Sequence, residues 1–348
     1  MASRQWSRSR RNFLISSASL AAAFVPGAGA FAALPDDKGP RAISGTNWTQ
    51  KTNLNFGSAT GIARFTDWLK AGWYMNPTPT FLNNECQTYT TTNNTDANPN
   101  FQVFQDHCDI VAIWNGGPIV PALGNRSISS LMIRYDIPDS AGAPSAIGYY
   151  ELTSKVPSVG GAWPAWWTIG HRPGGGRWGG VWGPEIDIFE FLNTDTKKVS
   201  STLHTGVPSP SYCFLKTGTA PPKGDPPAIP KTRFTTYTGT AAFNSGSFDY
   251  APGVDFSQDY HRYGAKIDTN YNISIWVDDV LVGIFAADQY CDDAGHPVSV
   301  ELVINLAVGN GPDPAGSIDR AGFGGANNAG PSNKFRLSVR NLQVWGPG

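Results

Sequence analysis

The stretch Trp182-Gly-Pro-Glu185-Ile-Asp187-Ile-Phe-Glu190-Phe places three carboxylates within six residues of a chain that is otherwise poor in charge. Its β-branched and aromatic residues favour a strand over a helix. Alternation along that strand puts Glu185 and Asp187 on one face and the isoleucines on the other. Glu190 is an odd number of residues from Glu185, so it reaches the same face only if the strand contains a one-residue bulge.

The bulge must also bring the two glutamates closer together. Neighbouring residues of a strand advance about 3.3 Å, so Glu185 and Glu190 would lie roughly 16 Å apart at Cα in a flat strand. We therefore predict an irregularity at Ile188 and Phe189, with at least one ladder hydrogen bond missing there. Three carboxylates beside buried apolar residues indicate a general acid, a nucleophile and a charged neighbour. The alternative is the polar edge of an ordinary strand.

The rest of the chain is typical of an all-β protein. Glycine and proline are abundant (39 and 27 residues), only 15% of the residues are charged, and no segment shows a long helical period. Short alternating or apolar runs lie between turn residues, as in Ser129–Tyr135, Ile273–Val277 and Val300–Ile304. This pattern predicts a β-sandwich or jelly roll in one domain, with no Ser/Pro linker to divide it.

Charge and aromatic content narrow the class of partner. The net charge of −1 argues against nucleic acid or an anionic membrane surface as the partner. The chain has 12 tryptophans, and the flat indole suits the C–H face of a sugar ring. The composition therefore favours a carbohydrate partner.

The N-terminus reads Ser9-Arg10-Arg11-Asn12-Phe13-Leu14-Ile15 and continues as a mild apolar run to Phe24. It resembles a twin-arginine export signal. A basic nucleic-acid arm and a membrane anchor are the alternatives, but serines dilute the apolar run and Pro26 ends it. We predict a signal peptide over residues 1–32, a single catalytic domain over 33–348, and export to a bacterial periplasm or the extracellular space.

Four cysteines are widely spaced and form no Cys-x-x-Cys motif, which argues against a zinc site. After export they could oxidise. Pairing of nearest neighbours predicts the disulfides Cys86–Cys108 and Cys213–Cys291. Four buried thiols are the alternative.

Several motifs, in order along the chain, resemble glycoside hydrolase family 16 and its laminarinase-like branch. The acidic run matches the bulged active-site strand Glu-x-Asp-x-x-Glu of that family. The other matching segments are Asn84-Glu85-Cys-Gln87-Thr-Tyr89, Gly161-Ala-Trp163-Pro-Ala-Trp-Trp167, Thr202-Leu-His204-Thr-Gly206, Asp255–Gly264 and Val303–Gly309. The resemblance implies a concanavalin-like jelly roll with one sheet bent into a concave substrate cleft.

The resemblance also implies roles for the three carboxylates. Glu185 matches the nucleophile, Glu190 the acid/base, and Asp187 the residue between them. A pair of carboxyl groups about 5–5.5 Å apart gives a covalent glycosyl-enzyme and net retention. The implied activity is an exported endo-acting hydrolase of a β-linked polysaccharide, on β-1,3- or mixed-linked glucan. A transglycosylase on the same fold and a non-catalytic glycan-binding lectin are the alternatives.

Six further residues are candidates for substrate binding. Trp163 and Trp167 fall on one face of their strand, which we expect to line the cleft, while Trp166 packs in the core; the alternative is that all three are core. His204 is a candidate for a bond to a sugar hydroxyl, a catalytic carboxylate or the backbone, and His261 is expected to be structural. The remaining candidates are Asn305, of the same kind as His204, and Trp178 and Trp182 in the glycine-rich loop before the acidic strand.

Many relatives carry a structural calcium ion that uses an aspartate of the last strand. Here Arg340 stands about where that aspartate is expected, and its charge would repel a cation. We therefore expect no cofactor, with a structural calcium ion as the alternative. We also expect no metal at the catalytic site and a monomer whose partner is the polysaccharide. The stretch 311–333 departs from the laminarinase pattern and leaves the glycan undecided.

Overall fold

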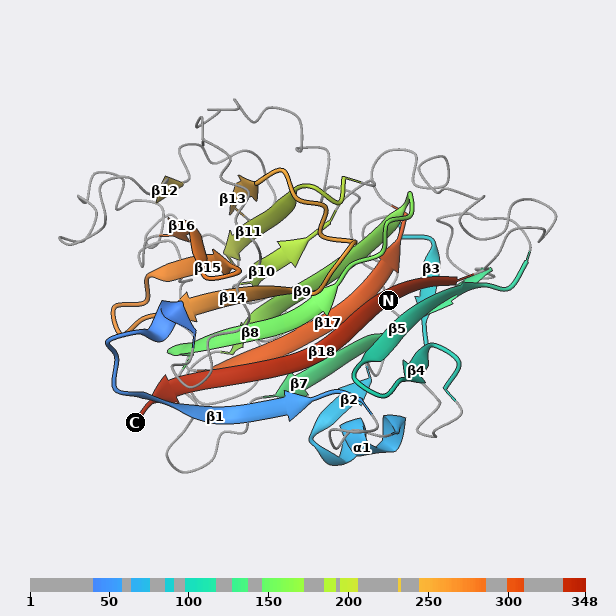
Figure 1. Ribbon diagram of the computed structural model, residues 1–348, viewed down its shortest axis with the longest axis horizontal. Helices are drawn as coiled ribbons and strands as arrows, with labels where there is room; N and C mark the ends of the chain where they lie inside the picture. Colours follow the sequence, from blue (N-terminus) through green and yellow to red (C-terminus); the bar gives the residue numbers. More distant parts are fainter. Residues whose placement is uncertain are drawn as a thin grey trace, which may run out of the picture.

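Two β-sheets packed face to face account for nearly all of the regular structure (Figure 1). The computed structural model describes residues 40–57, 64–75, 85–90, 98–116, 127–136, 146–171, 185–191, 195–205, 231–232, 244–285, 299–309 and 334–348. Within these ranges the chain is almost entirely β, which confirms the predicted fold class.

The seven-stranded sheet holds the acidic strand in its interior, third from one edge. Its order is β13 (Asn244–Tyr250), β11 (Val199–Thr205), β10 (Glu185–Glu190), β9 (Ala162–His171), β17 (Ser299–Val308), β7 (Met132–Asp136) and β2 (Trp73–Met75). All of its neighbouring strands are antiparallel.

The eleven-stranded sheet forms the second layer. Its order is β12 (Lys231–Thr232), β16 (Val280–Phe285), β15 (Ile273–Val277), β14 (His261–Ile267), β8 (Gly148–Lys155), β18 (Lys334–Pro347), β5 (Cys108–Trp114), β6 (Ile128–Ser130) and β3 (Gln87–Tyr89). In addition, β1 (Trp48–Asn55) pairs with β18 and β4 (Phe101–Val103) pairs with β5. Strand β1 therefore lies along the final strand, near the C-terminus (Figure 1).

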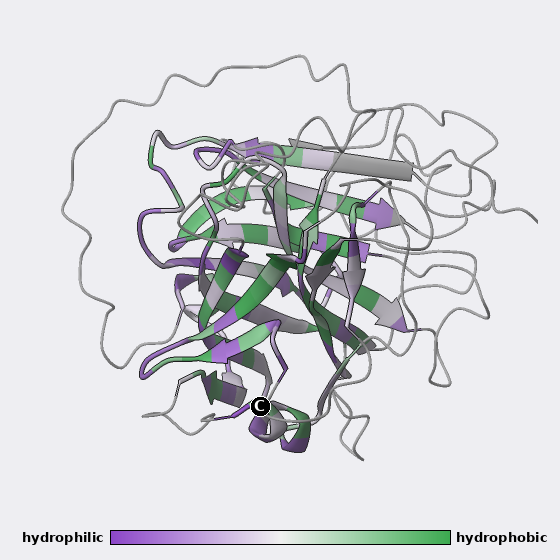
Figure 2. Cartoon of the chain, turned by 90° about the vertical axis from the view of Figure 1, so that its right-hand side faces the viewer, coloured by the Kyte–Doolittle hydropathy of each residue, from purple (hydrophilic) through white to green (hydrophobic). Residues whose placement is uncertain are grey.

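Alternation of side chains builds the core between the sheets. Every residue of β17, an interior strand of the seven-stranded sheet, is buried. Its even-numbered residues pack in the main core, which also takes Ile186 and Trp166 from this sheet and Leu152 and Tyr263 from the other. Figure 2 shows the apolar residues recurring along the strands of both layers. The prediction that Trp166 is a core residue is confirmed.

The run Ser129–Tyr135, predicted as one strand, changes sheets in its middle. Its first part forms β6 in the eleven-stranded sheet and its second part forms β7 in the seven-stranded sheet. The break falls at Leu131, which is completely buried and whose carbonyl accepts the Leu306 amide. Strands that switch sheets in this way form the corners of a sandwich, and nothing in the local alternation indicates where the switch occurs.

In the described residues, two short helices flank the sheets. The 3₁₀-helix η1 (Arg41–Ile43) packs its apolar residues against Tyr149 on the outside of the eleven-stranded sheet. Helix α1 (Phe65–Lys70) closes one end of the sandwich, where Trp68 packs against Trp73. No helix in the described part of the chain has the length and apolar character needed to cross a bilayer.

The predicted disulfide Cys86–Cys108 is wrong, because both residues are buried thiols. The register of the strands gives the reason. Gln87, next to Cys86, pairs with Ile128, and Ile128 pairs with Trp114 at the end of β5. Cys108 lies at the other end of β5, six residues away. Six residues of strand correspond to about 20 Å, and a disulfide requires Cα atoms within about 7 Å. Cys213 and Cys291 lie outside the described residues, and their pairing stays a prediction.

Burial raises the pKa of the Cys108 thiol to about 12, with a further contribution from the charge of Asp109. A thiol in this environment stays protonated at neutral pH, and the thiolate is the form that reacts. Cys108 is therefore expected to be inert towards oxidants in the folded protein.

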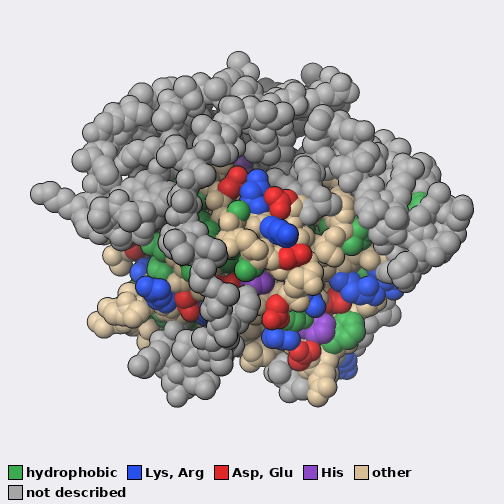
Figure 3. Space-filling model, turned by 45° about the horizontal axis from the view of Figure 1, so that its top comes forward, with side chains coloured by type: hydrophobic (Ala, Val, Ile, Leu, Met, Phe, Trp, Pro, Cys, Tyr) green, Lys and Arg blue, Asp and Glu red, His purple; other side chains and the backbone are tan. Residues whose placement is uncertain are grey.

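Arg340 on the last strand lies in a set of close polar and aromatic contacts. Its guanidinium pairs with Asp106 at 2.6 Å and lies over the ring of Tyr260, 3.7 Å from the centroid. The positive charge at this position is thus built into the surface of the eleven-stranded sheet. Elsewhere on the described surface that faces the viewer in Figure 3, acidic and basic side chains are interspersed and form no broad basic patch.

Candidate active site

Strand β10 contains the predicted bulge. Between Asp187 and Glu190, three steps along β10 correspond to two steps along each neighbouring strand, β9 and β11. The extra residue turns Glu190 to the same side as Asp187. The prediction of an irregularity at Ile188 and Phe189 is therefore confirmed.

A side chain of the neighbouring strand supports the bulge. Ser201 of β11 is buried, and its hydroxyl donates a hydrogen bond of 2.7 Å to the carbonyl of Ile188. A bulge takes a backbone group out of the regular ladder, and a buried carbonyl needs a donor. The Ser201 hydroxyl supplies one.

Replacing Ser201 by alanine is expected to lower the free energy of unfolding by about 1–3 kcal/mol, because the buried Ile188 carbonyl loses its donor. Chemical denaturation would measure this loss. The matched control is Ser154→Ala, which removes another buried hydroxyl, one with no hydrogen-bond partner among the described residues. Equal losses in the two variants would show that the Ile188 bond contributes nothing.

The bulge gathers the three carboxylates on the face of the seven-stranded sheet turned away from the core, here called the carboxylate face. Ile186, Ile188 and Phe189 are completely buried in the core on the opposite side. The neighbours of the carboxylates along the sheet are Ile169, Trp167 and Ala165 on β9 and His204, Thr202 and Ser200 on β11.

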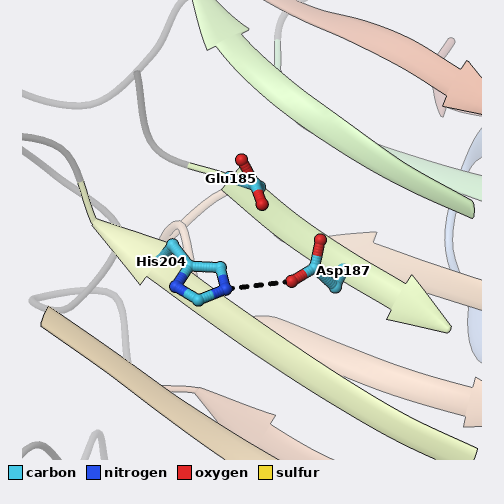
Figure 4. Close-up of side chains that lie close together, drawn as sticks. All are labelled: Glu185, Asp187 and His204. Atoms are coloured by element: carbon cyan, nitrogen blue, oxygen red, sulfur yellow. Dashed lines mark ion pairs between the residues drawn. The ribbon is translucent and has the colours of Figure 1, made fainter. Parts of the chain in front are cut away.

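Asp187 and His204 form an ion pair on this face (Figure 4). The imidazole Nε2 lies 3.1 Å from Oδ2 of Asp187, whose side chain is 4% exposed. Glu185 is half-buried beside them, and one polar atom from each of the three side chains lies within 4.8 Å of the others. Of the contacts predicted for His204, the structure therefore shows the one to a carboxylate. His204 thus gives the buried Asp187 carboxyl a polar partner.

Glu190 is buried and receives a hydrogen bond from Trp163. The indole Nε1 of Trp163 donates to Oε1 of Glu190 at 2.9 Å. Trp163 thus lies on the carboxylate face, as predicted, but its polar edge serves a carboxyl group of the protein.

Replacing Trp163 by phenylalanine keeps a ring but removes the N–H donor. A hydrogen bond to a charged group contributes about 1.5–3 kcal/mol, so kcat on a polysaccharide is expected to fall about 10- to 150-fold. Steady-state kinetics with a melting curve for each variant would measure this. Trp166→Phe is the matched control, since that indole faces the core: it is expected to lower Tm and spare kcat. A Trp163→Phe variant with normal kcat would contradict the role of the indole.

Trp167 and Asn305 are held to each other on the same face. The indole Nε1 of Trp167 donates to the Asn305 amide oxygen at 2.7 Å, and the amide nitrogen donates to the Tyr89 hydroxyl at 3.0 Å. All three side chains are buried. Burial, together with the charge of Glu85, raises the pKa of Tyr89 well above its usual range, so the phenol stays neutral and can accept this bond. Asn305 therefore positions two aromatic rings; its direct contact with sugar stays a prediction.

The sequence reading gave no role to two polar pairs beside the site. Glu85 accepts a bond of 2.5 Å from the Gln87 amide, whose oxygen in turn takes the backbone N–H of Val308. Arg134 pairs with Glu301, both almost completely buried. The sequence did carry signals for them: Glu85, Gln87 and Tyr89 are spaced by two within a segment that resembles the family. Arg134 and Glu301 each interrupt an apolar run.

Comparisons with solved structures place this architecture among known folds. The laminarinase catalytic domain of Thermotoga maritima superposes with a TM-score of 0.56 and 21% identity, covering 86% of this chain and 98% of that domain. SCLam, a non-specific endo-β-1,3(4)-glucanase of family GH16, gives a TM-score of 0.58 and 18% identity, covering 89% of this chain and 94% of its own. The chain has the jelly-roll fold of these glucanases. The predicted family resemblance is thus confirmed at the level of the fold.

Sequence similarity is more limited. The endo-1,3-1,4-β-glycanase EglC of Rhizobium meliloti is 38% identical over 58 residues, which is 17% of this chain and 11% of EglC. ExsH of the same organism, also an endo-1,3-1,4-β-glycanase, is 34% identical over a stretch of the same length. The match thus spans about a ninth of each relative. No family model matches the chain.

Two of the predicted binding residues, Trp178 and Trp182, lie outside the described residues. The others lie on the carboxylate face. Trp163 contacts Glu190, His204 contacts Asp187, and Trp167 of β9 contacts Asn305 of the next strand, β17.

Proposed function

We propose that this protein is a retaining, endo-acting glycoside hydrolase of a β-linked polysaccharide. The bulge of β10 carries the proposal, because it alone brings Glu185, Asp187 and Glu190 to one face of the sheet. A substrate of β-1,3- or mixed-linked glucan is supported by the similarity in fold to laminarinases and by the matched stretch of two endo-1,3-1,4-β-glycanases.

The first chemical step divides the work between the two glutamates. The protonated Glu190 gives its proton to the oxygen of the glycosidic bond. The carboxylate of Glu185 attacks the anomeric carbon from the opposite side, and the bond to the leaving sugar breaks. The product is a covalent glycosyl-enzyme, with Glu190 now ionised and still accepting the Trp163 N–H.

The second step reverses these roles. Glu190 takes a proton from a water molecule, the water oxygen attacks the anomeric carbon, and the ester to Glu185 breaks. Two inversions give net retention, and Glu190 regains the proton with which it began.

Asp187 and His204 would set the charge around the nucleophile. Glu185 and Asp187 approach each other closely, and two ionised carboxylates at such a distance repel. A protonated His204, 3.1 Å from Asp187, offsets that repulsion and lets Glu185 remain ionised for attack. The protonation of the three groups is coupled, so pH profiles report on the set and not on one residue.

A substrate panel tests the function. The protein would be incubated with β-1,3-glucan, mixed-linked glucan, galactan and an acidic exopolysaccharide, with products sized over time and the first-formed anomer read by NMR. We expect rapid shortening of a β-1,3- or mixed-linked glucan and initial release of the β-anomer. Release of the α-anomer would overturn the retaining mechanism, and no cleavage of any polymer would overturn the enzyme and favour a glycan-binding lectin.

We further propose that the protein is exported, acts as a monomer and needs no cofactor. The twin arginines support export, so replacing Arg10 and Arg11 by lysine is expected to leave an uncleaved precursor in the cytoplasm. Immunoblots of cell fractions would measure this. The control is the same pair of changes at Arg262 and Arg336, outside the signal. Normal export of the Arg10→Lys/Arg11→Lys variant would contradict the proposed route.

A further inference from the structure

The carboxylate face has two unlike halves on either side of β10. Over β9 and β17 its side chains are buried and bonded to one another, as Trp163, Trp167 and Asn305 show. Over β11 and β13 the same face carries small polar side chains that are half-buried or exposed. These are Ser200, Thr202, Ser247 and Asp249, here called the ledge.

Alternation along the two strands orients the ledge. On β13 Phe248 is buried in the core and Tyr250 packs against it, so Ser247 and Asp249 point the other way. On β11 the core takes Val199 and Leu203, which turns the intervening even-numbered residues outward. Because no Trp, Tyr or Phe of the described parts of β11 and β13 faces this side, the ledge offers hydroxyls and a carboxylate but no ring for stacking.

The ledge continues directly from the carboxylates. Glu190 lies opposite Ser200, and Ser200 lies opposite Asp249, so the three form one row across the sheet. In the next row Asp187 lies opposite Thr202, which lies opposite Ser247. A glycan that crosses β10 at right angles to the strands would therefore pass from the catalytic groups onto the ledge.

Contacts within the ledge hold it in place without closing it. The Ser200 hydroxyl donates to Asp249 at 2.8 Å, and Lys198 pairs with the other oxygen of Asp249 at 3.3 Å. Lys198 and Asp249 are about equally exposed, at 42% and 40% of their side chains. Such an exposed ion pair is weak and can yield to a competing sugar hydroxyl.

The position of Trp163 indicates which end of the substrate meets the ledge. Its indole approaches Glu190 from β9 and donates its N–H to Oε1. Trp163 thus fills the β9 side of Glu190. The departing sugar, which receives the proton of Glu190, is therefore placed on the other side, towards Ser200 and β13.

We propose that the ledge binds the sugars on the leaving-group side, by hydrogen bonds alone; this rests on the hydrolase function proposed above. A hydrogen bond contributes about 0.5–1.5 kcal/mol, whereas stacking on an aromatic ring contributes about 1–3 kcal/mol on the scale known for bases. The leaving fragment is thus held briefly and departs before it can attack the glycosyl-enzyme. Water takes its place, and the enzyme hydrolyses its substrate in preference to transferring it.

The experiment compares two substrates that differ on the leaving-group side. One is a β-1,3-gluco-oligosaccharide long enough to cover the ledge. The other is the para-nitrophenyl glycoside of a β-1,3-gluco-oligosaccharide, whose leaving group is the nitrophenol and carries no sugar. Asp249→Ala is expected to lower kcat/KM on the oligosaccharide about 2- to 12-fold, the range of one hydrogen bond, with a smaller loss on the aryl glycoside. Lys197→Ala is the control, since it removes a neighbouring exposed charge that is no part of the ledge, and it should leave both values unchanged.

A second variant tests the consequence for transfer. Ser247→Trp adds a ring to the ledge and is expected to raise the share of transfer products when acceptor sugar is abundant. If Asp249→Ala loses equally on both substrates, or loses nothing on the oligosaccharide, the ledge does not bind the leaving sugars. Hydrolysis by the wild-type protein would then still support the proposed hydrolase function. A wild-type protein that hydrolyses neither substrate would overturn the function and the ledge with it.

Discussion

Replacing Glu185 by glutamine is expected to lower kcat on polysaccharide on the order of 10⁴-fold or more, equivalent to about 5.4 kcal/mol of transition-state stabilisation. The amide has nearly the shape of the carboxylate but cannot form the bond to the anomeric carbon. Glu185 is half-buried and lies on the face away from the core, so the fold and the affinity for oligosaccharide should survive. Kinetics on the purified variant, with calorimetric binding of an oligosaccharide, would measure both properties.

Azide separates the loss of a nucleophile from a general disturbance of the site. In Glu185→Ala the space left by the side chain admits azide, which can attack the anomeric carbon once and give an inverted glycosyl azide. Rescue of this kind requires Glu190 and its Trp163 partner to be in place. A variant that keeps wild-type turnover, or one that azide converts to a retained product, would remove Glu185 from the role of nucleophile.

Local patterning predicted the acidic strand well. The alternation of Glu185 and Asp187 defines a face, and the odd spacing of Glu190 requires a bulge between them; both arguments use only neighbours in sequence. The structure places the bulge at Ile188 and Phe189 for the same reason, since their apolar side chains both enter the core.

Features that depend on pairing between distant strands were beyond the sequence. His204 meets Asp187 because β10 and β11 pair in one particular register, which no local pattern reveals. The wrong prediction of a Cys86–Cys108 disulfide has the same origin. Nearness in sequence does not determine whether two residues lie side by side in the register of the strands.

The tryptophan count was a weak guide for a different reason. Indole serves packing as readily as stacking on sugar, and Trp68, Trp73 and Trp166 are fully buried in the core. Trp163 and Trp167 lie on the carboxylate face, as predicted. Their N–H groups nevertheless donate hydrogen bonds within the protein, to Glu190 and Asn305. Alternation predicted which face of the sheet an indole occupies. It did not predict which atom accepts the hydrogen bond of the indole N–H.

Replacing Glu190 by glutamine is expected to produce a loss that depends on the leaving group. General acid catalysis contributes about 10²–10⁴-fold, so kcat on the natural polymer should fall by that factor. An aryl glycoside with a good leaving group needs little protonation, and its first step should be almost unaffected. The measurement is kcat/KM for a series of aryl glycosides and for the polymer, in wild type and variant.

Azide also identifies this role, with the opposite stereochemistry. In Glu190→Ala the nucleophile Glu185 is intact, so an aryl glycoside still forms the glycosyl-enzyme, and azide then attacks from the side that Glu190 has vacated. Two inversions give a glycosyl azide of retained configuration, whereas the Glu185 variant gives the inverted one. Ser200 borders Glu190 on the side of the departing sugar, so azide reaches this space as that sugar leaves the ledge. Equal losses on polymer and aryl glycosides, or an inverted azide product from Glu190→Ala, would show that Glu190 is not the acid.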